Sequence, residues 1–206
     1  MSEPATMMDM NPKTTGIILA GGLGKRFGGI NKALIQLFDK PLIELVIDEL
    51  RPQVDETLIS ANRNIVELSS FGYPVIEDNL KNSGPLGGIG SLIDHVTTDL
   101  VIVTTCDTMH IPKNFVTELE MSRKKNNADI AIAKTDMGIQ RLNFSTTKET
   151  LAGVRDFLTT GNLTVAQWQN EINACEVHFN STGKLLPLYN INTPDDLAAI
   201  ITATEA

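Results

Sequence analysis

The sequence predicts a single α/β domain with three layers, in which helices cover both faces of a predominantly parallel sheet. Short apolar runs rich in β-branched residues alternate with segments of helical spacing, and this order is typical of a parallel sheet. In addition, residues 100–105 are apolar on both alternating faces, as expected for a central strand that helices cover on two sides. Together, these two observations indicate a Rossmann-like arrangement.

The individual elements follow in order along the first two thirds of the chain. Each predicted strand is bounded by turn or charge signals, and the strands cover residues 16–20, 57–61, 74–77, 100–105 and 128–134. Helical spacing of apolar residues predicts the helices between them, over residues 42–50, 65–69, 86–95 and 114–124.

After residue 135 the alternation becomes less regular, so we expect an irregular C-terminal portion. The expected elements are an edge strand, a helix and two further strands, over residues 140–146, 147–158, 175–179 and 186–189, respectively. Thr193 precedes Pro194 at a first helical turn, and Asp195 and Asp196 are favourably placed against the helix dipole. A last helix is therefore predicted over residues 192–203.

Length and composition indicate one domain. The 206 residues suffice for one well-buried core, and no segment approaches the roughly 18 continuous apolar residues of a membrane span. Residues 1–15 have neither the basic start nor the apolar core of a secretory signal, so we interpret them as a flexible lead-in. Residues 16–206 would then form the domain, and we expect a cytoplasmic protein.

The overall charge argues against two classes of partner. A net charge of −8 provides no field to hold nucleic acid or an anionic membrane. Cys106 and Cys175 belong to no metal-ligand pattern, so both are expected to be buried thiols. Trp168, the single tryptophan, is expected in the core. The cations within residues 25–32 form a local cluster of positive charge in this otherwise acidic chain. Such a cluster indicates a place where an anion could be held.

The stretch LAGGLGKRFGG, residues 19–29, places five glycines directly after the first predicted strand. Residues without a Cβ let backbone amides approach phosphate oxygens closely, and Arg26 and Lys32 could neutralise the charge. The stretch is neither a dinucleotide fingerprint, because Phe27 stands where a third glycine is needed, nor a P-loop. A plain glycine-rich surface loop is the alternative interpretation.

Polar residues also follow the other predicted strands, and the carboxyl ends of parallel strands form the usual ligand-binding edge. Asp107 follows residues 100–105 and offers the hard oxygen that Mg²⁺ requires, although a strand-terminal Asp is also a common turn cap. The segment GPLGGIG, residues 84–90, opens a helix with four glycines. It would admit a base or phosphate, or would simply allow tight packing on the sheet.

Taken in order, LAGGLGKRFGG, NKAL, VIED, GPLGGI, CDTMHIP and NINTPDDL closely resemble the molybdenum cofactor guanylyltransferases of the nucleotidyltransferase superfamily. The resemblance covers roughly residues 16–200. It implies that GMP is transferred from GTP to molybdopterin with release of pyrophosphate, and that Mg²⁺ is the cofactor. It also implies transient contacts with molybdoenzymes or other cofactor-biosynthesis proteins.

The resemblance also implies roles for individual residues. The nucleotide would be held by Leu19, Ala20, Gly21, Gly22, Lys32, Ser60, Asp78, Gly88 and Asp107. Asp107 would bind the metal, and Asn190 and Asn192 would lie near the metal and the pterin phosphate. Arg26, Lys32 and Asp107 would be catalytic, with Arg26 facing the developing pyrophosphate charge.

This sequence departs from the family pattern at two places. Ser60 stands where the family tends to place an Asn that contacts the nucleotide. Residues 137–144 lack the His-Pro pair that the family usually carries there.

Two other functions remain open at this point. One is a nucleotidyltransferase of different specificity, which would use CTP with molybdopterin or another nucleotide with a sugar phosphate. The other is a non-catalytic carrier of pterin or nucleotide.

Overall fold

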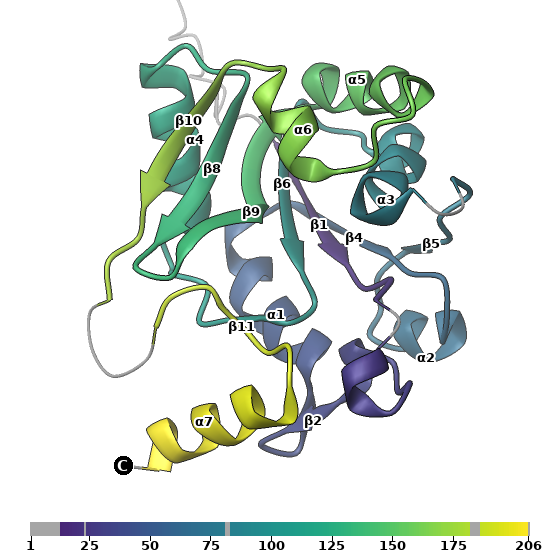
Figure 1. Ribbon diagram of the computed structural model, residues 1–206, viewed down its shortest axis with the longest axis vertical. Helices are drawn as coiled ribbons and strands as arrows, with labels where there is room; N and C mark the ends of the chain where they lie inside the picture. The colour runs from purple at the N-terminus through teal and green to yellow at the C-terminus, as the bar shows by residue number, and fades with distance from the viewer. Residues whose placement is uncertain (1–12, 23, 81–82, 182–185, 206) are drawn as a thin grey trace, which may run out of the picture.

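The computed structural model describes residues 13–22, 24–80, 83–181 and 186–205. Within these residues, seven strands form one sheet in the order β10-β8-β9-β6-β1-β4-β5, with β10 and β5 at its two edges (Figure 1). The strands are β1 (Thr14–Leu19), β4 (Glu56–Ser60), β5 (Val75–Ile76), β6 (Leu100–Thr105), β8 (Ile130–Thr135), β9 (Gly138–Thr147) and β10 (Ala174–His178).

Helices and short turns connect the strands. The α-helices are α1 (Leu42–Leu50), α2 (Ile65–Ser69), α3 (Gly84–Leu92), α4 (Phe115–Lys125), α5 (Lys148–Thr159), α6 (Val165–Asn170) and α7 (Pro194–Glu205). The 3-10 helices are η1 (Lys25–Phe27), η2 (Lys32–Leu34), η3 (Arg51–Gln53) and η4 (Ile93–His95). Two antiparallel pairs lie outside the main sheet, namely β2 (Gln36–Leu37) with β3 (Lys40–Pro41) and β7 (Thr108–Met109) with β11 (Tyr189–Asn190). No described helix is long and apolar enough to cross a lipid bilayer.

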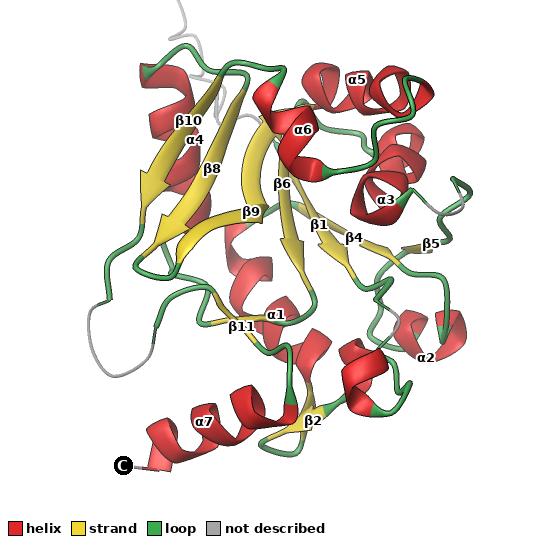
Figure 2. Ribbon diagram, in the orientation of Figure 1, coloured by secondary structure: helices red, strands yellow, loops and turns green. Residues whose placement is uncertain are grey.

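Alternating residues of the strands belong to two separate hydrophobic cores, one on each face of the sheet. Ile18 and Ile102 pack in the core that includes α1 and α4, whereas Ile17 and Val103 pack in the core that includes α3, α5 and α6. Because side chains alternate between the two faces of a strand, both faces must be apolar when helices cover both. Figure 2 shows these helices on the two sides of the sheet, which confirms the predicted three-layer α/β fold.

The pairing of the strands determines where the functional loops lie. β1 is parallel to both β4 and β6, and β4 is parallel to β5. In this register Leu19 is opposite Ser60 on one side and Thr105 on the other, and Ser60 is opposite Ile76. The loops that follow these strands therefore leave the sheet side by side at one edge.

The prediction of an edge strand over residues 140–146 is wrong. β9 lies between β6 and β8, antiparallel to both, and β10 forms the edge. Asn143, Ser145 and Thr146 of β9 are polar but buried, and they are hydrogen-bonded: Asn143 accepts from Thr104 Oγ1 at 2.7 Å, and Thr146 Oγ1 donates to the Asp129 carbonyl oxygen at 2.9 Å. Hydrogen bonding removes most of the cost of burying these groups, so a polar sequence can form a central strand.

Several boundaries differ from the predictions. β1 begins at Thr14, inside the expected lead-in of residues 1–15, of which residues 1–12 lie outside the described part. The strand expected over residues 186–189 is only the two-residue β11, and the C-terminal portion is irregular as predicted.

The six-residue helix α6 is too short to show a helical period and is not predicted from the sequence. It carries Trp168, which is buried, and the ring centroids of Trp168 and Phe144 are 5.8 Å apart. The prediction of a core tryptophan is therefore confirmed.

Candidate active site

The glycine loop after β1 contains glycines of two kinds. Gly24 has φ +56°, and a Cβ there would lie 1.8 Å from the Ile30 carbonyl oxygen; Gly28 and Gly29 also have positive φ. These three glycines allow the chain to fold back on itself. At Gly22, by contrast, a Cβ would have no neighbour within 4 Å, so this glycine leaves open space beyond the end of β1.

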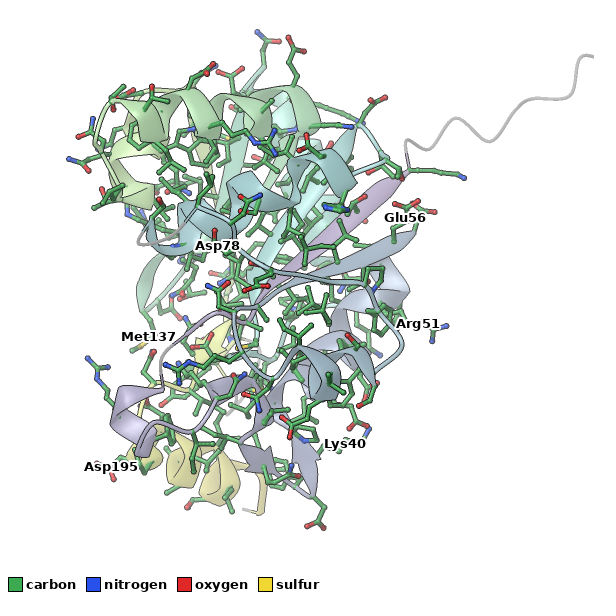
Figure 3. The ribbon with its side chains drawn as sticks, turned by 90° about the vertical axis from the view of Figure 1, so that its right-hand side faces the viewer. Lys40, Arg51, Glu56, Asp78, Met137 and Asp195 are labelled. Atoms are coloured by element: carbon green, nitrogen blue, oxygen red, sulfur yellow. The ribbon has the colours of Figure 1, made fainter. Side chains whose placement is uncertain are left out.

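A cavity of about 480 Å³ occupies this space at the carboxyl edge of β1, β4 and β6. Its described lining residues are Leu19, Gly21, Gly22, Lys32, Ser60, Asn62, Asp78, Gly84, Pro85, Gly88, Thr105, Cys106, Asp107 and Leu142. Asp78, which follows β5, is labelled in Figure 3. The structure thus brings eight of the nine predicted nucleotide residues to one cavity.

Of the residues predicted to bind the nucleotide or to be catalytic, two are not among the described residues that line this cavity. Ala20 is buried in the core, and its backbone amide donates to the Ser60 carbonyl oxygen at 2.8 Å, so it supports the cavity from behind. Arg26 is exposed on η1. Arg26 is therefore not among the described residues that line the cavity, and its expected role in neutralising a phosphate stays a prediction.

Lys32 and Asp107 form an ion pair at one end of the cavity. Lys32 Nζ bonds to Asp107 Oδ2 and donates to Asn192 Oδ1 at 2.9 Å. The other carboxylate oxygen of Asp107 accepts from Thr105 Oγ1. The side chains of Lys32 and Asp107 are 14% and 13% exposed, so solvent screens the pair only partly while a ligand can still reach it.

The C-terminal NINT segment reaches the same place through β11. The Ile191 amide donates to the Asp107 carbonyl oxygen at 3.0 Å, and Asn190 accepts from Thr108 Oγ1 at 3.0 Å. Asn190 Nδ2 also donates to Gln140 Oε1 at 2.8 Å. These bonds fix Asn190 beside the end of β6, and the bond from Lys32 Nζ holds Asn192, the other predicted substrate residue, beside Asp107.

A second cavity of about 290 Å³ lies next to the first one. Its described lining residues are Thr105, Asp107, Gln140, Arg141, Leu142, Asn143, Asn190 and Asn192. The two cavities share Thr105, Asp107 and Leu142, so they adjoin at these three residues. A site with this shape can hold two ligands with their reactive ends on either side of Asp107.

The first turn of α3 packs so closely on the sheet that it requires glycine. A Cβ on Gly88 would lie 2.5 Å from Ser60 Oγ, and one on Gly87 would lie 2.8 Å from the Leu80 carbonyl oxygen. Close packing is therefore one function of the glycines, although Gly88 also lines the cavity. Close packing on the sheet is confirmed, whereas the binding of a base or phosphate at this segment stays a prediction.

Replacing Gly88 with Ala should lower the free energy of unfolding by about 1–3 kcal/mol, because the new methyl group overlaps Ser60 Oγ. Chemical denaturation would measure this change. Gly153→Ala is the matched control: it lies within α5, where a Cβ would have no neighbour within 4 Å, and should stabilise the protein by about 0.5–1 kcal/mol. Adding Ser60→Ala should recover part of the loss in Gly88→Ala. Equal stability of the two Gly→Ala variants would contradict this packing.

Asp78 is held in place by its neighbours on both sides of the loop. Its Oδ1 accepts from the Leu80 amide at 2.8 Å and from Ser91 Oγ at 3.0 Å. Its own amide donates to Asn62 Oδ1 at 2.9 Å. The carboxylate is thus oriented before any ligand arrives.

Sequence reasoning missed several lining residues. Thr105 and Asn62 could have been found, because both lie at or just after the ends of predicted strands. Arg141 and Leu142 had no such signal, since they lie within the strand expected over residues 140–146 and not at its carboxyl end.

Cys106 lines the first cavity. The pKa of its thiol is raised, mainly by burial and further by the neighbouring Asp107. A thiol that stays protonated at neutral pH is a poor nucleophile, so Cys106 does not suit a covalent intermediate.

Asp107 and the Thr105 hydroxyl provide hard oxygen donors where the two cavities meet. Among the described residues, no group of three or more His, Cys, Asp or Glu side chains could hold a metal ion. This sparse donor set fits Mg²⁺, which usually keeps several waters and binds through one or two carboxylates together with substrate phosphates.

Comparison with known proteins identifies the family. Residues 16–172 match the MobA-like NTP transferase domain. The molybdenum cofactor guanylyltransferase of Polynucleobacter asymbioticus is 33% identical over 200 residues, which cover 92% of this chain and 96% of that protein. The protein of the same name from Yersinia pseudotuberculosis is 34% identical over 192 residues, which cover 91% of this chain and 94% of its own length.

Solved structures show the same fold. The molybdopterin-guanine dinucleotide biosynthesis protein A of Archaeoglobus fulgidus superposes with a TM-score of 0.75 at 23% identity, over 94% of this chain and all of that one. The inositol-1-phosphate CTP transferase of T. maritima superposes with a TM-score of 0.73 at 14% identity, over 95% and 98% of the two chains. The chain therefore belongs to the MobA-like NTP transferase family, as a nucleotidyltransferase related to the molybdenum cofactor guanylyltransferases.

Proposed function

We propose that this protein transfers GMP from GTP to molybdopterin and releases pyrophosphate. The observation that carries the proposal is the junction of two cavities at Asp107, with Lys32 bonded to that carboxylate. A transfer between two substrates needs such adjoining sites, because bringing the reacting groups together supplies much of the rate. The relatives named molybdenum cofactor guanylyltransferase support the choice of substrates.

The larger cavity would hold the nucleotide. The backbone of Gly21 and Gly22 would approach the phosphates, and Lys32 would bind them as a cation. Asp78 and the first turn of α3 would hold the ribose or the base. Arg26, exposed on the adjoining η1, is available to the leaving pyrophosphate.

The smaller cavity would hold the terminal phosphate of molybdopterin, with Asn190 and Asn192 beside it. An oxygen of this phosphate would attack the α-phosphorus of GTP in line, forming one P–O bond while the bond to pyrophosphate breaks. The side chains position the two phosphates and form no covalent bond with either.

Asp107 and Thr105 are the residues that would hold Mg²⁺. When bound, the ion neutralises charge on the phosphate oxygens. Lys32 holds the carboxylate of Asp107 in a fixed position, and Asn192 in turn orients Lys32. The ion pair therefore orients the groups that face the triphosphate.

Incubating the protein with GTP, Mg²⁺ and molybdopterin tests the proposal. We expect a pterin product whose mass corresponds to a guanine dinucleotide, together with pyrophosphate. Pyrophosphate release without molybdopterin, or an unchanged pterin in its presence, would contradict the proposed reaction.

A competition series with GTP, CTP, UTP and ATP tests the choice of nucleotide. We expect kcat/KM with molybdopterin to favour GTP over CTP by at least about tenfold, because polar groups arranged for guanine stay unpaired when cytosine binds. Preference for CTP would point to cytidylyl transfer. Faster transfer to a sugar phosphate than to molybdopterin would indicate a different acceptor.

A further inference from the structure

Among the described residues that line the smaller cavity is a cation, Arg141, that the proposed function has not used. β9 contributes Gln140, Arg141, Leu142 and Asn143 to this cavity, in the segment where the family's His-Pro pair is missing. Among its described lining residues, Asp107 and Arg141 are the charged ones. Because Asp107 is already paired with Lys32, Arg141 is the lining cation here without a carboxylate partner among these residues.

Arg141 is held at both ends by one buried amide. Its Nη1 donates to Gln169 Oε1 at 3.1 Å, and Gln169 Nε2 donates back to the Arg141 carbonyl oxygen at 2.7 Å. Gln169 is 2% exposed and lies on α6, so water competes little for either of its hydrogen bonds. This arrangement fixes both the backbone and the guanidinium of residue 141.

A guanidinium has five N–H donors in a planar fork, and this fork matches the oxygens of a phosphate. The bond to Gln169 uses one donor on Nη1. Lys32, the other cation near the junction, is already bonded to Asp107 and lines the larger cavity. Arg141 is thus the cation best placed to bind an anion in the smaller cavity.

We propose that Arg141 binds the terminal phosphate of the acceptor and that Gln169 is the positioning residue that holds the guanidinium in place. This inference rests on the proposed function, because it takes the smaller cavity as the acceptor site. A purely structural link between α6 and β9 is the alternative.

Steady-state kinetics at saturating GTP test the proposal in the Arg141→Ala variant. We expect the KM for molybdopterin to rise about tenfold, since a charge-assisted hydrogen bond contributes about 1.5 kcal/mol or more, while the KM for GTP stays within about twofold. Arg141→Lys should recover part of the affinity, because it keeps the charge but loses the fork.

Arg51→Ala is the matched control. Arg51 is exposed on η3, and Figure 3 shows it on the opposite side of the molecule from Met137, which precedes β9. Its kinetics should equal those of the wild type. An unchanged KM for molybdopterin in Arg141→Ala, or an equal rise in both KM values, would overturn the proposal.

Gln169→Met tests the positioning role, because methionine keeps most of the volume but removes both hydrogen bonds to residue 141. It should raise the KM for molybdopterin about threefold with little change in kcat. In combination with Arg141→Ala it should add nothing to that KM, since Gln169 acts through Arg141. Additive effects of the two substitutions would show that Gln169 acts independently and would overturn its assigned role.

Calorimetric titration of molybdopterin into the nucleotide-free protein separates this inference from the proposed reaction. Binding to the wild type that weakens about tenfold in Arg141→Ala supports the inference even if no GMP is transferred, in which case only the proposed reaction fails. Equal binding to both proteins overturns the inference alone. Absence of binding to the wild type contradicts both.

Discussion

Replacing Asp107 with Asn should lower kcat for GMP transfer about 10²- to 10³-fold. The substitution keeps an oxygen that can accept from Thr105 Oγ1, but it removes the negative charge that pairs with Lys32 and would hold Mg²⁺. Initial rates of pyrophosphate release, measured over a range of Mg²⁺ concentrations, would show the loss. The Mg²⁺ concentration needed for half-maximal rate should also rise.

Asp156→Asn is the control for this variant, because Asp156 is exposed on α5. It should retain wild-type kinetics. Thermal melting of both variants would show that any loss of rate is not a loss of folded protein. Turnover in Asp107→Asn within about threefold of the wild type would show that the Asp107 charge is not needed for catalysis.

Replacing Lys32 with Ala should lower kcat/KM for GTP about a hundredfold. Lys32 is the cation among the described residues that line the larger cavity, and its ammonium group also donates to Asn192. Its loss removes charge-assisted hydrogen bonds to the phosphates and releases Asp107 and Asn192 from their shared partner. Saturation kinetics in GTP, at fixed Mg²⁺ and molybdopterin, measure the change.

Lys40→Ala controls for the loss of a positive charge. Lys40 lies on β3, where it pairs with Asp48 at 2.7 Å and with Glu44, and its side chain is 44% exposed. Figure 3 shows it on the side of the molecule away from Met137. This variant should use GTP as the wild type does. If Lys32→Ala also used GTP normally, Lys32 could not be the residue that binds the phosphates.

The lining of the larger cavity could be predicted because many of its residues follow strands directly. Ser60 ends β4 and Asp107 follows β6, and both of these strands pair in parallel with β1. A parallel sheet aligns the carboxyl ends of its strands, so short-range sequence signals suffice to bring these residues together. The same reasoning did not separate the roles of the loop glycines, because Gly24, Gly28 and Gly29 shape the turn instead of lining the cavity.

The lining of the smaller cavity could not be predicted in the same way. β9 contains Asn143, Ser145 and Thr146, whose polar side chains suggest solvent exposure. These side chains are nevertheless buried, and they form hydrogen bonds with residues far away in the sequence. Arg141 is fixed by Gln169, which lies 28 residues away on a helix too short to show a period. Partners of this kind are set by tertiary packing, and a pattern within one segment does not reveal them.

The position of Arg26 shows a further limit of the sequence. Three cations within residues 25–32 indicated a phosphate site, yet Lys32 lines the cavity while Arg26 is exposed on η1. Residues close in sequence can point in different directions once the loop folds back at Gly24. Clustering of charge therefore located the loop, but not the role of each cation.

A crystal structure with Mg²⁺ and an α,β-methylene analogue of GTP, which cannot release pyrophosphate, tests the central claim most directly. We predict that the triphosphate lies over Gly21 and Gly22 within hydrogen-bond distance of Lys32 Nζ, with the ion on Asp107 and the guanosine against the first turn of α3. A triphosphate bound at the opposite edge of the sheet, or one that contacts neither Lys32 nor Asp107, would contradict it.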